Sequence, residues 1–426
     1  MTKLINKKIG IIGLGYVGLP LSVEFGKKRS VLGFDKNKKR IEELNNNFDS
    51  SSELSEDLLE EAVNLKFSSN IKDLKDCGIF IITVPTPVDL NNKPDLEPLK
   101  EATREVANFL KEGNLVIYES TVYPGATEEV CVPILEEVSQ LKYNQDFYCG
   151  YSPERINPGD KEHSLRFVKK ITSGSNDYSA DVVDQLYSEI IDAGTYRTES
   201  IKVAEAAKVI ENTQRDVNIA FVNELVHIFK KMDLDTTDVL KAAKTKWNFL
   251  DFTPGLVGGH CIGVDPYYLT FKAKELGYNP QIITSGRKIN DGMGEFVATD
   301  IKNELLKRDI NISKTRALIL GLSFKENCRD IRNTKVIDLA SSLEDMGIKI
   351  QIFDPWVDKE DAKNQFSIEC LEELPNKAVY DLIVLAVAHE QFLEMGVDSI
   401  RSLIVPGGLL YDLKSVFPKE KVDGRM

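Results

Sequence analysis

A glycine-rich turn near the start of the chain constrains the fold more than any other feature. Residues 8–12 (KIGII) predict a short buried strand, and GLGYVG (13–18) follows at once and opens a helix. A second strand-like run, SVLGFD, ends at Asp35, about twenty residues after the turn begins, which is the spacing of the dinucleotide fingerprint. The strand, turn, helix and second strand together predict a Rossmann unit that binds a dinucleotide.

Each glycine of the turn has a distinct expected role. Gly13 permits the tight turn, Gly15 lets the backbone approach a pyrophosphate, and Gly18 lets helix and strand pack closely. The helix N-terminus adds unpaired N–H groups and a positive dipole end for the phosphates. Asp35 is expected to accept hydrogen bonds from ribose hydroxyls, which favours NAD over NADP.

A basic run follows the second strand and complicates this preference. Lys36, Lys38, Lys39 and Arg40 resemble the solvated face of a helix, which is what most charge runs are. We therefore keep NAD as the expected cofactor, with Arg40 as a phosphate or ribose contact.

Further strand-like runs, GIFIITV and NLVIYES, alternate with helical segments, a pattern typical of a parallel doubly wound sheet. Polar or proline-rich loops follow each run, and ligands of such sheets bind at the carboxyl ends of the strands. Prolines also simply terminate strands. The loop residues expected to line the cofactor are Thr83, Pro85, Thr86, Ser120 and Thr121.

A carboxylate, Glu154, follows the next strand-like run, FYCGYSP. A carboxylate at a strand end that faces the ligand crevice can act as a general base, although a single glutamate is usually a surface charge.

A helix of roughly 30 residues is predicted between Glu199 and Met232, where there is no Gly or Pro and apolar residues recur at helical spacing. Lys208 and Asn212 are four residues apart and share one face, with Glu205 one turn earlier. A Lys–Asn pair that faces a cleft can hold an oxyanion or a water. On spacing alone, solvated helix residues are the favoured interpretation.

The segment 254–266, PGLVGGHCIGVDP, suits a loop that surrounds a reactive thiol. Gly258 and Gly259 allow strained backbone angles and close approach to a ligand before Cys261. Asp265 supplies a carboxylate and Pro266 stiffens the exit from the loop. A free cysteine, however, usually packs as a small hydrophobe.

A second strand and helix alternation begins near residue 314, with RALILGL, a helix over 334–346, IQIFDP, YDLIVLAV and GGLLYDL. Its first turn lacks the three-glycine spacing and carries Lys325, Arg329 and Arg332 instead. Basic side chains of this kind suit the pyrophosphate of a nucleotide-linked substrate. A structural domain with incidental basic residues is an equal alternative.

The expected architecture is therefore α/β, with two Rossmann-like doubly wound domains joined by a long central helix. We expect an NAD-binding domain over 1–198, a central helical domain with the cysteine loop over 199–310, and a C-terminal substrate-binding domain over 311–426. Apolar residues on more than one face of the long helix suggest a homodimer.

Composition excludes several classes of function. A net charge of −13 argues against a general nucleic-acid binder. The six cysteines form no CxxC and the four histidines no HExxH, so no metal site is expected. The N-terminus has neither a signal peptide nor a membrane span, and no membrane contact is expected. A reducing cytoplasm fits and would keep a thiol free.

Six motifs occur in one order along nearly the whole chain: GLGYVGLP, STVYPGAT, SPER, AEAAKVIENTQRDVNIAFVNE, GGHCIGVDP and GLSFKENCRDIRNT. In these the chain resembles the UDP-glucose/GDP-mannose 6-dehydrogenase family. The resemblance implies oxidation of the C6 alcohol of a nucleotide-sugar to a carboxylate with two NAD. A thiol adduct would keep the intermediate aldehyde bound for the second hydride transfer.

The resemblance also implies roles for single residues. Cys261 would carry a thiohemiacetal and then a thioester, while Lys208 and Asn212 would stabilise the developing oxyanion. Thr121 and Asp265 would hold a water that relays protons, and Glu154 would help hydrolyse the thioester. Lys325 and Arg332 would contact substrate and cofactor. The remaining residues expected from the resemblance are Tyr16 and Val17 for the cofactor, and Arg155, Ile156, Asn157, Arg215, Phe252, Gly255, Gly258, Gly259, His260 and Phe324 for the substrate.

SPER and GGHC replace the SPEF and GGSC that are typical of the UDP-glucose branch, and they resemble the bacterial UDP-N-acetylhexosamine branch that serves capsule and O-antigen synthesis. UDP-N-acetylglucosamine or UDP-N-acetylgalactosamine is the expected substrate, with UDP-glucose or UDP-N-acetylmannosamine as alternatives and GDP not excluded. His260 is expected to be a substrate contact or a structural residue.

Two rival functions remain at this point. A single-step β-hydroxyacid-type dehydrogenase also has an N-terminal dinucleotide fold and a helix-borne Lys–Asn pair, but it gives Cys261 no task. A non-catalytic NAD or nucleotide-sugar sensor is the alternative from a different class, although the retained Cys261 and Lys208 disfavour it.

Overall fold

The computed structural model describes residues 2–51, 53–89, 91–154, 165–259 and 262–426. The chain forms two compact units. The N-terminal unit comprises Met1–Glu211 and Tyr267–Tyr278, and the C-terminal unit comprises Asn212–Pro266 and Asn279–Met426. Each unit contains its own sheet. The three-domain division expected from the sequence remains a prediction.

The N-terminal unit is built on a sheet that has, within the described residues, eight strands in the order β3-β2-β1-β4-β5-β6-β7-β8. Neighbouring strands pair in parallel except for the antiparallel pair β6 and β7. The strands β1, β2, β4 and β5 are buried at every position, as expected for a parallel sheet covered on both faces. Their bounds are β1 Ile9–Ile12, β2 Val31–Phe34, β3 Leu65–Ser68, β4 Ile79–Ile82, β5 Asn114–Tyr118, β6 Phe147–Tyr151, β7 Lys170–Gly174 and β8 Thr195–Arg197.

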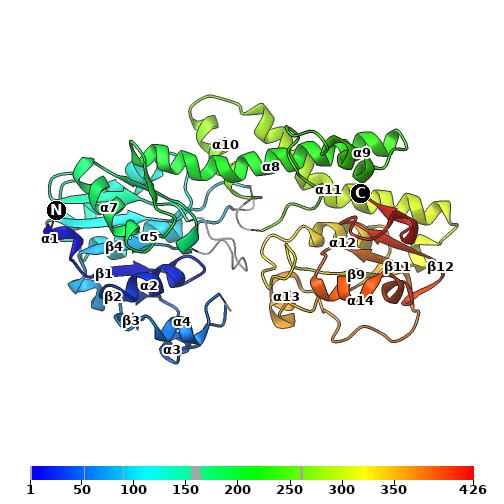
Figure 1. Cartoon of the computed structure of the whole chain (residues 1–426), viewed down its shortest axis with the longest axis horizontal. Helices are drawn as coiled ribbons and strands as arrows, with labels where there is room; N and C mark the ends of the chain where they lie inside the picture. Colours follow the sequence, from blue (N-terminus) through cyan, green and yellow to red (C-terminus); the bar gives the residue numbers. More distant parts are fainter. Residues whose placement is uncertain (1, 52, 90, 155–164, 260–261) are drawn as a thin grey trace. The chain divides into compact units, whose positions relative to one another are not determined.

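Helices alternate with these strands along the chain (Figure 1). They are α1 Thr2–Ile5, α2 Gly18–Gly26, α3 Lys38–Asn45, α4 Glu56–Glu60, α5 Glu97–Ala107, α6 Val132–Ser139 and α7 Asp177–Ser188, with shorter turns η1 Ile71–Asp76, η2 Thr127–Cys131 and η3 Leu165–Phe167. Apolar side chains of α2 and α7 pack on the central strands and form one core with them. The doubly wound fold expected from the alternation is confirmed.

The C-terminal unit contains a second parallel sheet, of five strands among the described residues, in the order β10-β9-β11-β12-β13. This order is that of the common doubly wound sheets that begin in the middle and extend outward. The strands are β9 Arg316–Leu320, β10 Lys349–Phe353, β11 Tyr380–Leu385, β12 Ile404–Asp412 and β13 Gly424–Arg425; the helices are α9 Thr236–Ala243, α11 Gln281–Lys307, α12 Val336–Asp345, α13 Lys359–Phe366 and α14 Glu390–Arg401, with turns η4 Ile312–Lys314 and η5 Lys419–Lys421.

The long helix predicted from the sequence is α8, Ile201–Lys231, of 31 residues. It begins in the N-terminal unit and ends in the C-terminal unit, so it joins the two as expected. A further helix, α10, spans Asp265–Glu275. Pro266, which is expected to stiffen the exit from the loop, lies at the start of this helix. Asp265 and Pro266 form the first turn of α10, where a proline costs no hydrogen bond.

Candidate functional site

The glycine turn after β1 has the geometry that its sequence predicts. Gly13 has a φ of +96°, which favours glycine. A Cβ on Gly18 would lie 1.8 Å from the carbonyl oxygen of Gly13, so only glycine lets α2 start this close to the turn. A Cβ on Gly15 would meet no atom within 4 Å. The space over Gly15, next to the N-terminus of α2, fits the approach of a dinucleotide pyrophosphate.

Asp35, directly after β2, is tied to this turn. Its carboxylate accepts hydrogen bonds from the backbone N–H of Leu14 at 2.9 Å and of Asn37 at 2.9 Å. The carboxylate therefore fixes the turn against the end of β2, in addition to the ribose contact expected from the sequence.

Arg40 is held by protein groups. Its Nη1 lies 2.7 Å from Oδ1 of Asp49, whose side chain is fully buried, and its Nε donates to the carbonyl oxygen of Leu14 at 3.2 Å. A guanidinium committed to a buried carboxylate is poorly placed to neutralise a 2′-phosphate, which agrees with the expected preference for NAD. Its role as a cofactor contact remains a prediction.

The hydroxyls in the loops after β4 and β5 brace these loops. Thr83 donates to the carbonyl oxygen of Gly13 at 2.7 Å, Thr86 donates to that of Thr121 at 2.6 Å, and Ser120 donates to that of Val84 at 2.6 Å. The hydroxyl groups thus join three strand ends at the carboxyl edge of the sheet, where a cofactor would bind. Prolines that terminate strands do not explain why hydroxyl residues occur in these loops. The hydrogen bonds to the backbone explain them.

Glu205 on α8 holds the loop that follows Thr121. Its carboxylate is buried and accepts hydrogen bonds from the backbone N–H groups of Gly125 at 2.5 Å and Thr127 at 2.9 Å. Burial raises the pKa of Glu205 to about 7, although these hydrogen bonds oppose the rise. The sequence located Glu205 one turn before Lys208 but gave no sign that it anchors the STVYPGAT loop.

Glu154 belongs to a buried charge cluster that the sequence did not reveal. Nζ of Lys170, in β7, lies 2.8 Å from Oε2 of Glu119 and 3.2 Å from Oε2 of Glu154. Tyr187 of α7 donates its hydroxyl to Glu119. Only 2% of the Lys170 side chain and 9% of the Glu154 side chain are exposed. The available sequence signal was Glu119, a charged residue directly after the mostly apolar strand β5.

The amide of Asn212 and the carboxylate of Asp265 are paired in the C-terminal unit. Nδ2 of Asn212 donates to Oδ2 of Asp265 at 2.6 Å, and both side chains are buried. Lys208 lies one turn earlier on α8 and is also buried. The alternative of solvated helix residues, favoured on spacing alone, was therefore wrong.

The loop before the thiol is fixed within the C-terminal unit. Asn223 of α8 donates to the carbonyl oxygen of Gly255 at 3.0 Å and accepts from its N–H at 2.9 Å. A Cβ on Gly258 would lie 2.8 Å from the carbonyl oxygen of Asn333, and one on Gly259 would lie 2.8 Å from the ring of Phe324. Packing against these two residues requires glycine at both positions, and the φ of +83° at Gly259 agrees with the strained backbone expected there.

A buried network supports Asn223. It donates to Oδ1 of Asn290 at 2.8 Å, and Asn290 donates to Oδ1 of Asp216 at 2.7 Å. Arg287 donates to the same Asp216 oxygen at 2.6 Å. The network connects α8 and α11 beneath the loop, so the loop rests on two long helices.

The second Rossmann-like sheet repeats the Asp35 arrangement with one change. Asp354 follows β10 and accepts the N–H of Leu322 at 2.6 Å, as Asp35 accepts that of Leu14. Here the carboxylate is also 3.0 Å from Nε2 of His389, and both side chains are fully buried. A buried, histidine-bound carboxylate is not free to accept hydrogen bonds from a ribose as expected of Asp35.

The other expected residues have varied exposure. Arg215 and Pro85 are exposed, whereas Phe324 is half-buried. Arg332 is half-buried and donates to both carboxylate oxygens of Asp330, and Nζ of Lys325 lies 5.7 Å from the centre of the Phe324 ring. Tyr16, Val17, Thr121 and Phe252 are half-buried. Arg155, Ile156, Asn157, His260 and Cys261 lie outside the described residues.

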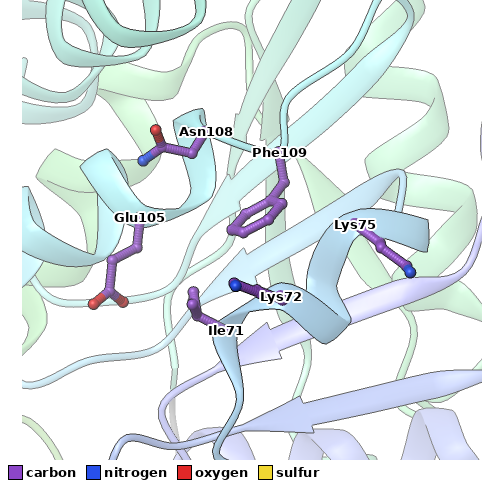
Figure 2. Close-up of a pocket in the computed structure, with 6 residues that line it drawn as sticks. All are labelled: Ile71, Lys72, Lys75, Glu105, Asn108 and Phe109. Atoms are coloured by element: carbon purple, nitrogen blue, oxygen red, sulfur yellow. The ribbon is translucent and has the colours of Figure 1, made fainter.

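An apolar hollow lies away from the strand ends described above. Figure 2 shows Phe109 between α5 and η1, pointing towards Ile71 and Lys72. The hollow has a volume of about 520 Å³. Its residues Lys75 and Asn108 shortly precede β4 and β5, so it lies towards the amino ends of these strands, opposite the edge where ligands of such sheets bind.

No group of three or more His, Cys, Asp or Glu side chains suitable for a metal ion occurs in the part of the chain that the structure describes. Among the same residues, no helix is long and apolar enough to cross a membrane.

Three family profiles match the chain in order. Residues 7–191 match the NAD binding domain of the UDP-glucose/GDP-mannose dehydrogenase family, residues 202–292 match its central domain, and residues 318–419 match its UDP binding domain.

Individual proteins are similar over the full length. The UDP-N-acetyl-D-glucosamine 6-dehydrogenase of Pseudomonas aeruginosa is 56% identical over 419 residues, which cover 98% of this chain and 99% of that protein. The enzyme of the same name from Salmonella typhi is also 56% identical over 419 residues, with 98% of each chain covered. The solved structure of a UDP-D-ManNAc dehydrogenase from Pyrococcus horikoshii has a TM-score of 0.89 at 30% identity and covers 97% of this chain and 96% of its own.

Proposed function

Since this chain belongs to the UDP-glucose/GDP-mannose dehydrogenase family, it is an NAD-dependent nucleotide-sugar dehydrogenase, and we propose that it oxidises a UDP-N-acetylhexosamine at C6. UDP-N-acetyl-D-glucosamine is the first candidate and UDP-N-acetylgalactosamine the second. The observation that supports this choice of substrate is the full-length similarity to two UDP-N-acetyl-D-glucosamine 6-dehydrogenases. UDP-N-acetylmannosamine is a further alternative, because the enzyme from Pyrococcus horikoshii, which is less similar, is named for it.

The proposed reaction is an oxidation of the C6 alcohol to a carboxylate by four electrons. NAD, when bound, accepts a hydride in each of two oxidation steps. The thiolate of Cys261 adds to the C6 aldehyde to form a thiohemiacetal, whose oxidation leaves a thioester. Water then releases the uronic acid and restores the thiol. The part of Cys261 rests on its motif, GGHCIGVDP.

The described residues have roles in this scheme that fit their surroundings. The N–H groups around Gly15 and the N-terminus of α2 would bind the pyrophosphate of NAD. Asn212 and Lys208, both buried on α8, would supply hydrogen-bond donors to the oxyanion that develops at C6. Asp265, bound to Asn212, would hold the water that relays protons, together with Thr121.

A three-domain organisation with bounds 1–198, 199–310 and 311–426 is part of the proposal. It is supported by the three family profiles, because each matched range falls inside one of these segments. We further propose a cytoplasmic location, since Cys77, Cys131, Cys149, Cys328 and Cys370 are free thiols. The product, a nucleotide-linked uronic acid, suits the synthesis of surface polysaccharide.

A homodimer through α8 is also proposed. Exposed apolar side chains on this helix follow the spacing 7, 11 and 7: Val203, Ile210, Phe221 and Ile228 are each 45% to 53% exposed. At about 100° per residue these positions fall within about 20° of one another and form a single apolar stripe. A stripe of this kind is typical of a helix that packs against a second copy of itself.

The experiment that tests the proposed function measures NADH formed per UDP-N-acetyl-D-glucosamine consumed, for the wild type and for Cys261→Ala. About two NADH per sugar in the wild type, and no carboxylate from the variant, support a thiol-dependent double oxidation. One NADH per sugar with an indifferent variant would indicate the single-step dehydrogenase. UDP-N-acetylgalactosamine, UDP-N-acetylmannosamine and UDP-glucose are compared in parallel to identify the sugar, and no NADH with any of them would indicate the sensor.

A further inference from the structure

The buried cluster around Lys170 contains more charge than packing requires. Two carboxylates, Glu119 and Glu154, share one ammonium, and a tyrosine hydroxyl fixes the far side of Glu119. Exchanging a buried ion pair for apolar residues of similar size is often neutral or stabilising, so burial of these charges is weak grounds for a purely stabilising role.

The cluster connects the interior of the N-terminal unit to the expected site. Glu119 directly precedes Ser120, whose hydroxyl braces the β4 loop, and Glu154 follows β6. Lys170 begins β7 and reaches both carboxylates. The two glutamates thus follow neighbouring strands, β5 and β6, whose carboxyl ends form the edge where ligands bind.

The geometry gives the three charged residues different tasks. Glu119 is completely buried, and Tyr187 and Lys170 both contact it, so it acts as an anchor. Lys170, held at 2.8 Å by that anchor, places its ammonium against one oxygen of Glu154. Glu154 is the outermost of the three, because 9% of its side chain is exposed compared with 0% for Glu119.

We propose that Lys170 is a positioning residue that orients the Glu154 carboxylate for hydrolysis of the acyl-enzyme, and that Glu119 and Tyr187 hold Lys170 in place. The inference rests on the proposed function, because it concerns the thioester on Cys261. In this step Glu154 takes a proton from water while the water oxygen bonds to the thioester carbon. The carbon–sulfur bond then breaks, and the departing sulfur takes up that proton. No electrons leave or enter.

The electrostatics of the cluster agree with this role. Burial raises the pKa of Glu119 to about 7, against the opposing effect of the Lys170 ammonium, while Glu154 adds to the rise. The titratable and charged groups that face Glu119 are Lys170, Glu154 and Tyr187.

The test uses Lys170→Met in the full chain, with Glu154→Gln for comparison and Lys170→Arg as the conservative variant. The two hydride transfers precede hydrolysis, so Lys170→Met is expected to give a rapid burst of about two NADH per subunit, followed by turnover slowed about 100-fold. The mass of the intact protein should show the sugar acyl group on Cys261. Glu154→Gln should show the same burst and the same acyl-enzyme. Lys170→Arg should recover part of the rate. The double variant Lys170→Met/Glu154→Gln should be no slower than the slower of the two single variants.

A purely structural role gives a different pattern. If Lys170→Met lowered the burst and the steady-state rate by the same factor, without an acyl-enzyme, the proposal would be wrong. The proposal would also be wrong if the rate losses of Lys170→Met and Glu154→Gln added up in the double variant. Thermal unfolding of each variant reports on folding. If Lys170→Met fails to fold, Tyr187→Phe, which removes one hydroxyl and keeps all three charged groups, replaces it; accumulation of acyl-enzyme supports the proposal and its absence overturns it.

Failure of the proposed function is recognised separately in the wild type. One NADH per sugar, or full activity of Cys261→Ala, would show that no thioester forms, whatever the Lys170 variants do. Two NADH per sugar in the wild type without accumulation in Lys170→Met would retain the function and discard the role of Lys170.

Discussion

Asn212 donates a hydrogen bond from Nδ2 to Oδ2 of Asp265 at 2.6 Å, and this contact joins the central helix α8 to the first residue of α10. Both side chains are buried. The contact fixes which end of the Asn212 amide faces Asp265, so the amide cannot turn freely. Asp265 is four positions after Cys261, so the pair anchors the chain shortly after the thiol, while Asn333 donates to the carbonyl oxygen of Gly259 at 3.3 Å shortly before it.

Asn212→Ala is expected to lower kcat by about 100-fold, because it removes the fixed donor that we propose for the oxyanion at C6. Asn218→Ala is the matched control, since Asn218 lies on the same helix and donates only to the backbone oxygen of Gln214 among the contacts seen. Steady-state kinetics of NADH formation measure both variants. Equal rates for the two variants would remove Asn212 from the oxyanion site.

Gly258→Ala is expected to reduce the free energy of unfolding by about 1–3 kcal/mol, because its Cβ would lie 2.8 Å from the carbonyl oxygen of Asn333. Gly255→Ala is the control, since a Cβ there meets no atom within 4 Å. Urea unfolding followed by circular dichroism compares the two. A Gly255→Ala variant as unstable as Gly258→Ala would contradict the packing of the thiol loop described above.

Glu205→Gln is expected to change how stability depends on pH. Burial raises the pKa of Glu205 from an ordinary 4.5 to about 7 in the folded chain. The folded state therefore binds a proton that the unfolded chain releases at lower pH. The stabilisation is full below about 4.5 and is lost as the pH rises to about 7, by on the order of 3 kcal/mol.

Urea unfolding of Glu205→Gln at several pH values between 5 and 8 measures this effect. Glutamine does not titrate, so the decline in stability with rising pH should be smaller than in the wild type. Glu224→Gln, at an exposed position of α8, is the control. If stability depended on pH equally in Glu205→Gln and the wild type, the pKa of Glu205 would be the same in the folded and the unfolded chain, and the prediction would be wrong.

Asp49→Asn is expected to weaken the preference for NAD. Asp49 is buried and holds the Arg40 guanidinium at 2.7 Å, and its neutralisation would free Arg40 to meet a 2′-phosphate. We expect the ratio of kcat/KM for NADP to that for NAD to rise about tenfold, equivalent to about 1.4 kcal/mol. Ser50→Ala is the control, because it removes a 3.4 Å contact with Arg40 and a hydrogen bond to Glu43 but keeps the Asp49–Arg40 ion pair. An unchanged ratio would leave Asp35 as the sole determinant.

The fold could be predicted from the sequence because its signals are local. The four-residue strands β1 and β4 consist almost wholly of β-branched and aromatic residues and are buried throughout. The helix α8 follows from a long segment without Gly or Pro. The turn at Gly13 and Gly18 needs glycine for reasons that lie within one strand, turn and helix unit.

The site was predicted less completely, because its contacts join residues far apart in the sequence. Lys170 lies 51 residues from Glu119, and nothing near either residue indicates the other. The strained backbone expected of the glycine pair is found at Gly259, whose φ is +83°, but the close packing of Asn333 and Phe324, more than 60 residues away, could not be predicted. Only the folded chain brings such partners together.

The last prediction concerns the apolar stripe on α8. Phe221→Glu places a charge in the centre of the stripe formed by Val203, Ile210, Phe221 and Ile228. Burying an unpaired carboxylate in an apolar interface is costly, so the variant should have the mass of one chain in sedimentation equilibrium where the wild type has the mass of two. Lys231→Glu is the control, because this exposed residue lies about 80° around the helix from Phe221. If Phe221→Glu kept the mass of the wild type, the stripe would not be the dimer interface.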